Sequence, residues 1–376
     1  MHRLTFYPLG NADTCLVETS AGAVLLFDYA AMADPDDPSD RRIDLPRAIR
    51  ERLDVLGRDH VDVLALTHLD QDHIQGVSDF FVLEHASKYQ GRGRVKISNL
   101  WVPAAAITES KETLTDDGRA VQAEARYRLQ RGEGVRVFSR PAALKEWLAE
   151  HGLTIESRAH LITDAGQLVP SFKKDADCVE FFAHSPFADR EDGKLVDRNS
   201  GSLVLQATFT AAGRDSRLML GGDVSYEIWT RIVTVTKAHA NDHRLEWDVF
   251  KLPHHCSYLS LGPEKGRQVT KPVPEAVWLF EHQGAVRSIA VATSDPIPAR
   301  DTDQPPHRQA AAYYRGVSVG HRGKFFVTME HPTQHSPKPL VVVVDRLGAR
   351  LWTGAEPGGT VVPAPTVVRP RKPYAR

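Results

Sequence analysis

Four side chains that can bind a metal ion lie within six consecutive positions. The stretch THLDQDHIQG, residues 67–76, carries His68, Asp70, Asp72 and His73. Imidazole nitrogens and carboxylate oxygens are ligands that zinc, manganese and iron accept in proteins. The stretch follows VDVLALT, which is typical of a β-strand, and precedes a predicted helix. The spacing therefore predicts a metal site on a strand-to-helix turn, where side chains can converge. The alternative is that the two aspartates only cap the helix.

Two later clusters hold the same position relative to a predicted strand. LMLGGDV places Asp223 at the end of an apolar run, and KLPHHCS places His254 and His255 at the end of another. Each cluster alone has an ordinary explanation, because a strand-end Asp is commonly a cap and a lone His is commonly a core or surface residue. The carboxyl ends of strands form one rim of an α/β sheet, so the three clusters together predict a shared site.

The elements that would position these clusters are short β-branched and apolar runs, interrupted by a few helical patterns. Helices are expected at 45–56, after Gly76 and at 120–132. Strands are expected at 3–9, 14–19, 23–29, 61–67, 98–104, 177–183, 202–209, 217–223, 248–253, 287–293, 324–330, 339–345 and 349–354. This interleaving predicts a layered α/β domain and excludes a helical bundle or a repeat array.

Two segments differ in composition from their surroundings. Residues 105–175 are rich in charge and helix formers, which predicts a helical insertion in a domain that spans residues 1–353. Residues 354–376 are rich in Pro and Gly and contain four basic side chains, which predicts a flexible basic tail. These side chains are Arg369, Arg371, Lys372 and Arg376.

Composition points to an ordinary soluble protein. The chain has 376 residues, a formal net charge of -1 and 41% hydrophobic residues. A neutral charge balance argues against wholesale coating of nucleic acid. No apolar run is long enough to span a bilayer, and the first residues do not resemble a secretory leader, so no membrane partner is expected. The three cysteines lie far apart in the sequence, and we expect a reducing, cytoplasmic environment.

The motifs resemble those of a known superfamily. THLDQDHIQG is similar to the HxHxDH signature of the metallo-β-lactamase fold, and LGGD and HHCS resemble its later ligand motifs. The match is closer to the hydrolase domain of ComEC-type DNA-uptake proteins, which also carry Asp at the position of Asp70. LGNADTCLVET, AVLLFDYA, RNSGSLVL and, with altered order, QPPHRQAAAYY resemble further motifs of that branch. The resemblance runs from about residue 3 to about residue 315 and implies a four-layer αββα sandwich.

The resemblance also implies two divalent cations, zinc or manganese, held by residues of the three clusters. The implied ligands are His68 and Asp70 for one ion, Asp72 and His73 for the other, Asp223 between them, and either His254 or His255. The third His of the superfamily falls near Asn199, so an amide or water completes that position. Cys256 and Ala12 replace glycines of the family pattern.

Two cations can hold a shared hydroxide, because a bound metal lowers the pKa of water to roughly 7. Asp72 and Asp223 are therefore expected to be essential for catalysis, both as metal ligands. Asp70 in place of an imidazole makes the site more anionic and favours manganese relative to an all-histidine site. His307 either donates a proton to a leaving oxygen or is a surface histidine at the start of a helix.

Phosphodiester hydrolysis, with nucleic acid as the substrate, is the function that the resemblance and the metal site favour. Arg126, Arg128, Arg131, Lys251 and the basic tail could contact a phosphate backbone, although such arginines often form only a solvated helix face. The alternatives are hydrolysis of a small phosphodiester such as a cyclic nucleotide, or a non-catalytic, metal-stabilised partner in a multi-protein system. Lactam, lactone or thioester hydrolysis is disfavoured, because those branches retain the histidine that Asp70 replaces.

Overall fold

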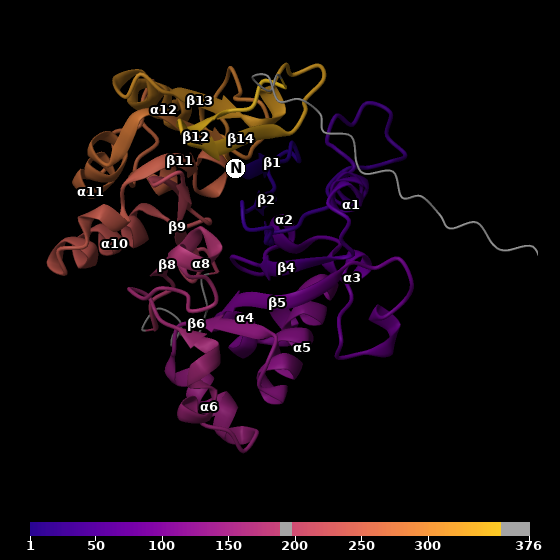
Figure 1. The fold of residues 1–376 in the computed structure, drawn as a ribbon. Coiled ribbons are helices and arrows are strands. Elements are labelled where there is room, and N and C mark those ends of the chain that lie inside the picture. The colour runs from indigo at the N-terminus through magenta and orange to yellow at the C-terminus, as the bar shows by residue number, and fades with distance from the viewer. Residues whose placement is uncertain (189–197, 355–376) are drawn as a thin grey trace, which may run out of the picture.

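Two β-sheets face each other at the centre of the molecule, and helices cover their outer sides (Figure 1). The computed structural model describes residues 1–188 and 198–354. The larger sheet has the strand order β15-β14-β1-β2-β3-β4-β5-β6-β7, and the smaller sheet has the order β13-β12-β11-β10-β9-β8.

The strands of the larger sheet are β1 (His2–Phe6), β2 (Cys15–Glu18), β3 (Val24–Phe27), β4 (His60–Ala65), β5 (Lys96–Pro103), β6 (Val135–Phe138), β7 (Ile162–Thr163), β14 (Leu340–Asp345) and β15 (Gly348–Leu351). Those of the smaller sheet are β8 (Val179–Ser185), β9 (Val204–Ala211), β10 (Arg214–Leu220), β11 (Trp247–Lys251), β12 (Gly284–Ala292) and β13 (Lys324–Val327). The α-helices are α1 (Leu45–Val55), α2 (Gln71–Ile74), α3 (Val77–Phe80), α4 (Ala105–Thr108), α5 (Asp116–Arg131), α6 (Ala142–Glu150), α7 (Ile155–Arg158), α8 (Lys174–Asp177), α10 (Tyr226–Ala238), α11 (Pro274–Val277) and α12 (Arg308–Gly320).

Three hydrophobic cores separate four layers. Alternate residues of a strand point to opposite faces of its sheet. In β3, Leu25 and Phe27 accordingly enter the core between the sheets, whereas Val24 and Leu26 pack toward helices α1, α3, α5 and α6. The third core lies between the smaller sheet and helices α10, α11 and α12. This layering confirms the predicted four-layer αββα sandwich.

Capping residues set the ends of helices α1 and α5. At the start of α1, the side chain of Asp44 accepts a hydrogen bond from the backbone N–H of Arg47. The apolar face of α1 packs against the larger sheet. Thr115 caps α5 in the same way. Gly132, with φ 91°, ends α5 in the left-handed conformation that glycine adopts at little cost.

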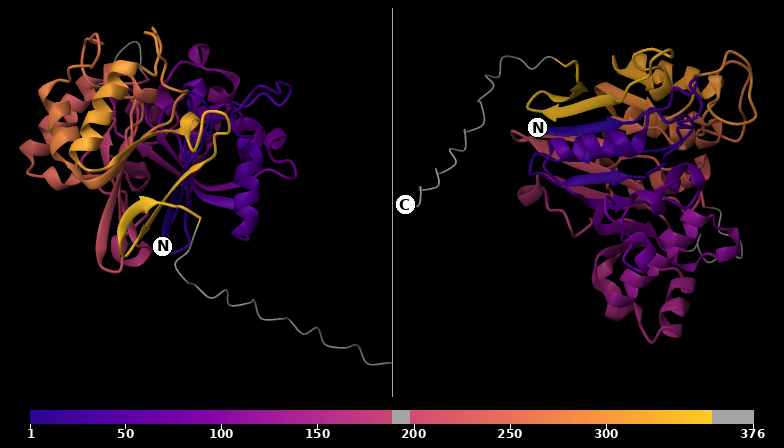
Figure 2. Two further views of the ribbon diagram at one scale, coloured as in Figure 1. Left: turned by 90° about the horizontal axis from the view of Figure 1, so that it is seen from above. Right: turned by 90° about the vertical axis from the view of Figure 1, so that its right-hand side faces the viewer.

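Each sheet combines an antiparallel half with a parallel half. In the larger sheet, strands β3 to β7 are parallel, and β14 pairs antiparallel with β1, so the last described strands lie beside the first (Figure 2). In the smaller sheet, β10 to β13 are parallel. The carboxyl ends of β3, β4, β10 and β11 lead into the loops that carry the candidate site residues.

The structure confirms a strand in each of the runs where a strand was expected and corrects the expectation for residues 105–175. That region is not purely helical, because β6 and β7 extend the parallel half of the larger sheet. Beyond Gly354, the predicted tail lies outside the described residues.

Within the described ranges, every helix is too short or too polar to span a bilayer. The three cysteines form no disulfide with one another.

Candidate metal centre

Asp28 organises the turn that follows β4. It comes directly after β3, and its carboxylate accepts hydrogen bonds from the backbone N–H of Thr67 at 2.7 Å and from the Thr67 hydroxyl. Its Oδ2 also lies 2.9 Å from Nδ1 of His73. A carboxylate at Nδ1 fixes the orientation of an imidazole and leaves Nε2 free to bind a metal. Asp28 therefore positions both the turn and the His73 ring.

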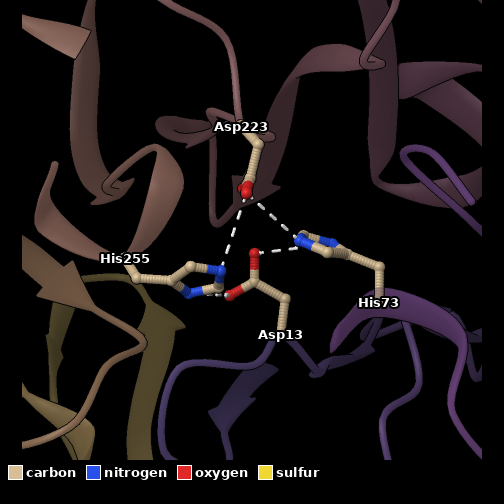
Figure 3. A group of neighbouring side chains, drawn as sticks. All are labelled: Asp13, His73, Asp223 and His255. Carbon is tan, nitrogen blue, oxygen red and sulfur yellow. Dashed lines mark ion pairs between the residues drawn. The ribbon is translucent and has the colours of Figure 1, made fainter. Parts of the chain in front are cut away.

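Asp13, His73, Asp223 and His255 offer ligand atoms that all lie within 4.8 Å of one another, and none of the four residues is more than 3% exposed (Figure 3). Nε2 of His73 lies 3.4 Å from Oδ2 of Asp223, and Nε2 of His255 lies 3.6 Å from the same oxygen. Oδ2 of Asp72 is 2.9 Å from Nε2 of His255. The structure thus brings His73, Asp72, Asp223 and His255, which were expected to share a site, to one point.

The backbone after β11 determines which of the two adjacent histidines faces this point. Three consecutive residues have positive φ: His254 at 48°, His255 at 50° and Cys256 at 67°. This conformation is strained for side chains other than glycine and is often found at functional sites. It places Nδ1 of His255 2.8 Å from the carbonyl oxygen of Thr293, so that its Nε2 points to Asp72 and Asp223. His254 is outside the four-residue cluster.

Asp13 belongs to the cluster by distance, but its oxygens have other partners. One oxygen forms an ion pair with the buried Lys251, and the other accepts a hydrogen bond from the Thr293 hydroxyl. Asp13 approaches His73 and His255 from their Nδ1 sides, at 3.7 and 3.9 Å, opposite the atoms that face Asp223. We therefore interpret Asp13 as a residue that supports the ligands.

The sequence analysis missed Asp13 and Asp28 as site residues. Asp28 had the same signal as Asp223, an acidic residue at the end of an apolar strand, and both residues lay in stretches that resemble family motifs. The distinction between a ligand and a supporting residue depends on which atom of each imidazole faces the carboxylate, and that is a tertiary feature.

His68 and Asp70 form a second group beside the first. The His68 ring is 2% exposed, and its centroid is 4.0 Å from that of His73. Nε2 of His68 lies 3.4 Å from Oδ2 of Asp70. The other oxygen of Asp70 accepts a hydrogen bond from Arg198 at 2.6 Å, and Arg198 also contacts Glu109. Asp70 therefore presents one oxygen to His68 while Arg198 holds the other.

Asn199 and His307 are less closely connected to the cluster. The backbone carbonyl of Asn199 accepts a hydrogen bond from the backbone N–H of Ser202. The Ser202 hydroxyl lies 3.5 Å from Nδ1 of His68. A ligand role for Asn199 stays a prediction.

His307 is only 2% exposed, so the expectation of a surface histidine is wrong. Its ring nitrogens lie near the N–H of Tyr258 and the carbonyl of Asp303, so proton donation would break an existing contact.

The residues present fit a divalent cation. Among the described residues, three buried atoms at this site have no hydrogen-bond partner: Nε2 of His68, Nε2 of His73 and Oδ1 of Asp223. Buried polar atoms are nearly always satisfied, so unsatisfied atoms on metal-binding side chains indicate a ligand that completes them. Imidazole nitrogen together with carboxylate oxygen is a donor set for zinc, manganese or iron.

Charge in the cluster shifts the pKa values of its members. Burial disfavours the imidazolium form of His255, but Asp223, Asp72 and Asp13 outweigh burial and raise its pKa to about 9. Burial likewise opposes the charged form of His73, yet Asp223, Asp28 and Asp72 raise its pKa well above the usual value. Burial would raise the pKa of Asp223, but the neighbouring His73 and His255 lower it well below normal. Without a cation, protons on the imidazoles balance the carboxylates.

The basic side chains expected to contact a phosphate backbone have other roles. Lys251 is 4% exposed and pairs with Asp13. Arg128 is 1% exposed and pairs with Glu124 at 2.6 Å. Arg131 pairs with Glu84.

Arg126 donates hydrogen bonds to the carbonyl of Ile107 and is only partly exposed. The three arginines of α5 therefore have partners within the protein, and contact between them and a phosphate backbone stays a prediction. The basic residues of the tail lie outside the described residues.

No family model matches this chain, and no curated protein matches it. Solved structures with some likeness include unliganded yeast PDE1, at 10% identity and a TM-score of 0.42 over 87% of this chain and 97% of that chain. A diphosphatase of the PhnP family has 11% identity and a TM-score of 0.31 over 77% and 86%. The metallo-β-lactamase SMB-1 has 12% identity and a TM-score of 0.30 over 66% and 79%. These likenesses are too distant to decide the activity, which has to be inferred from the site.

Replacing Asp28 by Asn should weaken metal binding, because the amide loses the charge that orients the His73 ring. Loss of such an outer partner typically costs about 10- to 100-fold in metal affinity. Zinc affinity can be measured by competition with a chromophoric chelator. Asp215→Asn is the matched control, because it alters a carboxylate on β10 that pairs with Lys174 of α8. Equal affinities in the two variants would show that Asp28 does not act on the metal site.

The metal-free protein should lose stability as pH rises from about 6.5 to about 9. The folded pKa of His255 lies above its unfolded value, so its stabilising contribution is complete below pH 6.5 and disappears as the ring deprotonates near pH 9. Denaturant unfolding of chelator-treated protein across this range measures the effect, which His255→Gln should reduce. A free energy of unfolding that rises across this range in the wild type would contradict the assignment.

Proposed function

We propose that this chain is a metal-dependent hydrolase of the metallo-β-lactamase fold that cleaves phosphodiesters. One observation carries the proposal: two buried imidazoles, His73 and His255, direct Nε2 toward the carboxylates of Asp72 and Asp223. Their Nδ1 atoms are held from behind by Asp28 and by the Thr293 carbonyl. Such preorganised donors are typical of a metal centre and are costly to bury for any other purpose.

Divalent cations bound here would polarise a phosphoryl oxygen and supply hydroxide at neutral pH. The protein residues hold the ligands in position and exclude water from one side of the site. Asp223, buried just after β10, faces both imidazoles and would hold a cation together with them. The Asp72 side chain is 33% exposed, whereas that of Asp223 is 3% exposed, so Asp72 lies on the side from which a substrate can enter.

A second cation would be held by His68 and Asp70, together with Asp223. The carboxylate of Asp70 supports this placement, because Arg198 occupies only one of its oxygens. A carboxylate at this position makes the centre more anionic than an all-histidine site. The ComEC-type branch that the motifs resemble also carries Asp here, whereas lactam-hydrolysing branches retain a histidine, and this difference supports phosphodiesters over lactams. Among phosphodiesters, nucleic acid is our first proposed substrate and a small phosphodiester is the second. The pairing of Arg128 and Arg131 with carboxylates supports the second, because these arginines are then not free to bind a phosphate backbone.

Asp72→Asn and His255→Gln should each reduce the turnover of bis-(p-nitrophenyl) phosphate by at least about 100-fold, the upper end of the loss seen when only an outer partner is removed. His254→Gln is the matched control, because it alters the adjacent residue of the same type outside the cluster. Thermal unfolding of each variant checks that it folds. Comparable turnover by wild type and His255→Gln would overturn the proposed site.

Wild-type protein reloaded with zinc or manganese should contain two metal equivalents per chain, and His68→Ala should contain one. The expected difference follows from the separate positions of the His68–Asp70 pair and the His73–His255 pair around Asp223. Elemental analysis after removal of excess metal gives the stoichiometry. A single equivalent in the wild type would mean that the ion pair with Arg198 prevents the second site from forming.

A further inference from the structure

A basic cavity of about 840 Å³ lies at the opposite end of the parallel strands from the metal cluster. Its wall includes Asp59, directly before β4, and Lys96, at the start of β5, whereas the cluster follows the end of β4. The six residues of β4 span about 20 Å at roughly 3.3 Å per residue. The cavity is therefore distinct from the metal centre, and its volume falls within the range of small-ligand sites.

Three arginines of this wall have no carboxylate partner among the described residues. Arg50 donates a hydrogen bond to the carbonyl of Gly93 and lies 4.6 Å from the centroid of the Phe80 ring. Arg94 donates to two backbone carbonyls, including that of Phe81 at 3.0 Å. Arg92 is exposed on the same loop. Carbonyl contacts hold the Arg50 and Arg94 guanidinium groups in place without neutralising them, and such groups are suited to recognise phosphate.

The acidic residues of the wall are largely occupied by other basic side chains. Asp59 pairs with Lys96 at 2.6 Å. Glu84 pairs with Arg128 and Arg131 of α5. Asp54 is the remaining carboxylate of the wall.

The last basic residue of the wall, Arg58, pairs with Asp62. Three unneutralised guanidinium groups against one carboxylate leave the cavity with a net positive charge.

An aromatic ring completes the cavity. Tyr127 of α5 lines the wall and is 38% exposed, so part of its ring is open to solvent. A guanidinium group of Arg131 lies 5.4 Å from the ring centroid. Exposed aromatic rings beside arginines form stacking platforms for bases, whereas a cavity for inorganic phosphate needs no such ring.

We propose that this cavity binds a nucleoside phosphate, with the phosphate at Arg92, Arg50 and Arg94 and the base at Tyr127. The ligand is a free nucleotide or one nucleotide of a single strand, and both present the same chemistry. This site is independent of the proposed hydrolysis, since it shares no residue with the metal cluster.

The test measures binding of a fluorescent ADP analogue and of a short labelled oligothymidylate to full-length protein in buffer with chelator, which keeps metal from holding phosphate at the cluster. Arg92→Glu should weaken binding by about tenfold or more, the loss expected for one hydrogen bond to a charged group. Arg346→Glu makes the same charge change at an exposed arginine between β14 and β15 and should leave binding unchanged. Tyr127→Ser should weaken binding of ADP but not of pyrophosphate.

Binding of ADP assigns the site to a free nucleotide, and binding of the oligonucleotide alone assigns it to a strand. For a strand that places one phosphate at the arginines, the logarithm of affinity should fall with the logarithm of salt at a slope near -0.7, and more steeply for each further phosphate contacted. Absence of binding by both probes would overturn the proposal, as would equal loss in Arg92→Glu and Arg346→Glu. Pyrophosphate binding as tight as that of ADP would overturn the role of Tyr127. Turnover of bis-(p-nitrophenyl) phosphate by Arg92→Glu should match the wild type, which separates this result from the proposed function.

Discussion

Asp13, Asp28 and Asp223 are buried together where loops of both sheets meet, and the structure of this region depends on how their charges are balanced. An unpaired buried carboxylate costs several kcal/mol, so each requires a partner. Lys251 pairs with Asp13, and Thr67 and His73 bind Asp28. For Asp223 the facing groups are two imidazoles, and one of its oxygens has no hydrogen-bond partner among the described residues. A bound cation would satisfy the charge that these contacts leave.

The sandwich creates this arrangement because its two parallel halves end on the same side. Asp28 and His68 follow strands of the larger sheet, whereas Asp223 and His255 follow strands of the smaller sheet. Neither sheet alone contains the complete set. Packing of the core between the sheets therefore also sets the distances within the site, and disturbance of that core should affect metal binding without any change in the ligands.

Basic side chains divide into those used for structure and those left for ligands. Lys251 and Arg128 are buried and form ion pairs with Asp13 and Glu124. These ion pairs stabilise the fold, and neither side chain is accessible to a substrate. Arg50, Arg92 and Arg94 have no carboxylate partner among the described residues, and backbone carbonyls accept hydrogen bonds from Arg50 and Arg94. A nucleotide or strand is therefore expected to contact Arg50, Arg92 and Arg94 rather than the paired arginines Arg128 and Arg131.

The sequence by itself determined the layered α/β architecture and the turn with His68, Asp70, Asp72 and His73, because period-two apolar runs and the local concentration of ligand types are encoded over a few residues. It also indicated Asp223 and the His254–His255 pair by their positions after strands. It did not reveal β6 and β7, because their short runs lie between helices in a segment rich in charge and helix formers, whereas the equally short β2 and β3 lie within longer apolar runs.

Only the tertiary structure decided the choice between His254 and His255, since it depends on three successive positive φ angles and on the Thr293 carbonyl. It also decided the roles of Asp13 and Asp28 and the burial of Lys251, because pairing partners more than 200 residues apart, such as Lys251 and Asp13, meet only when the two sheets pack.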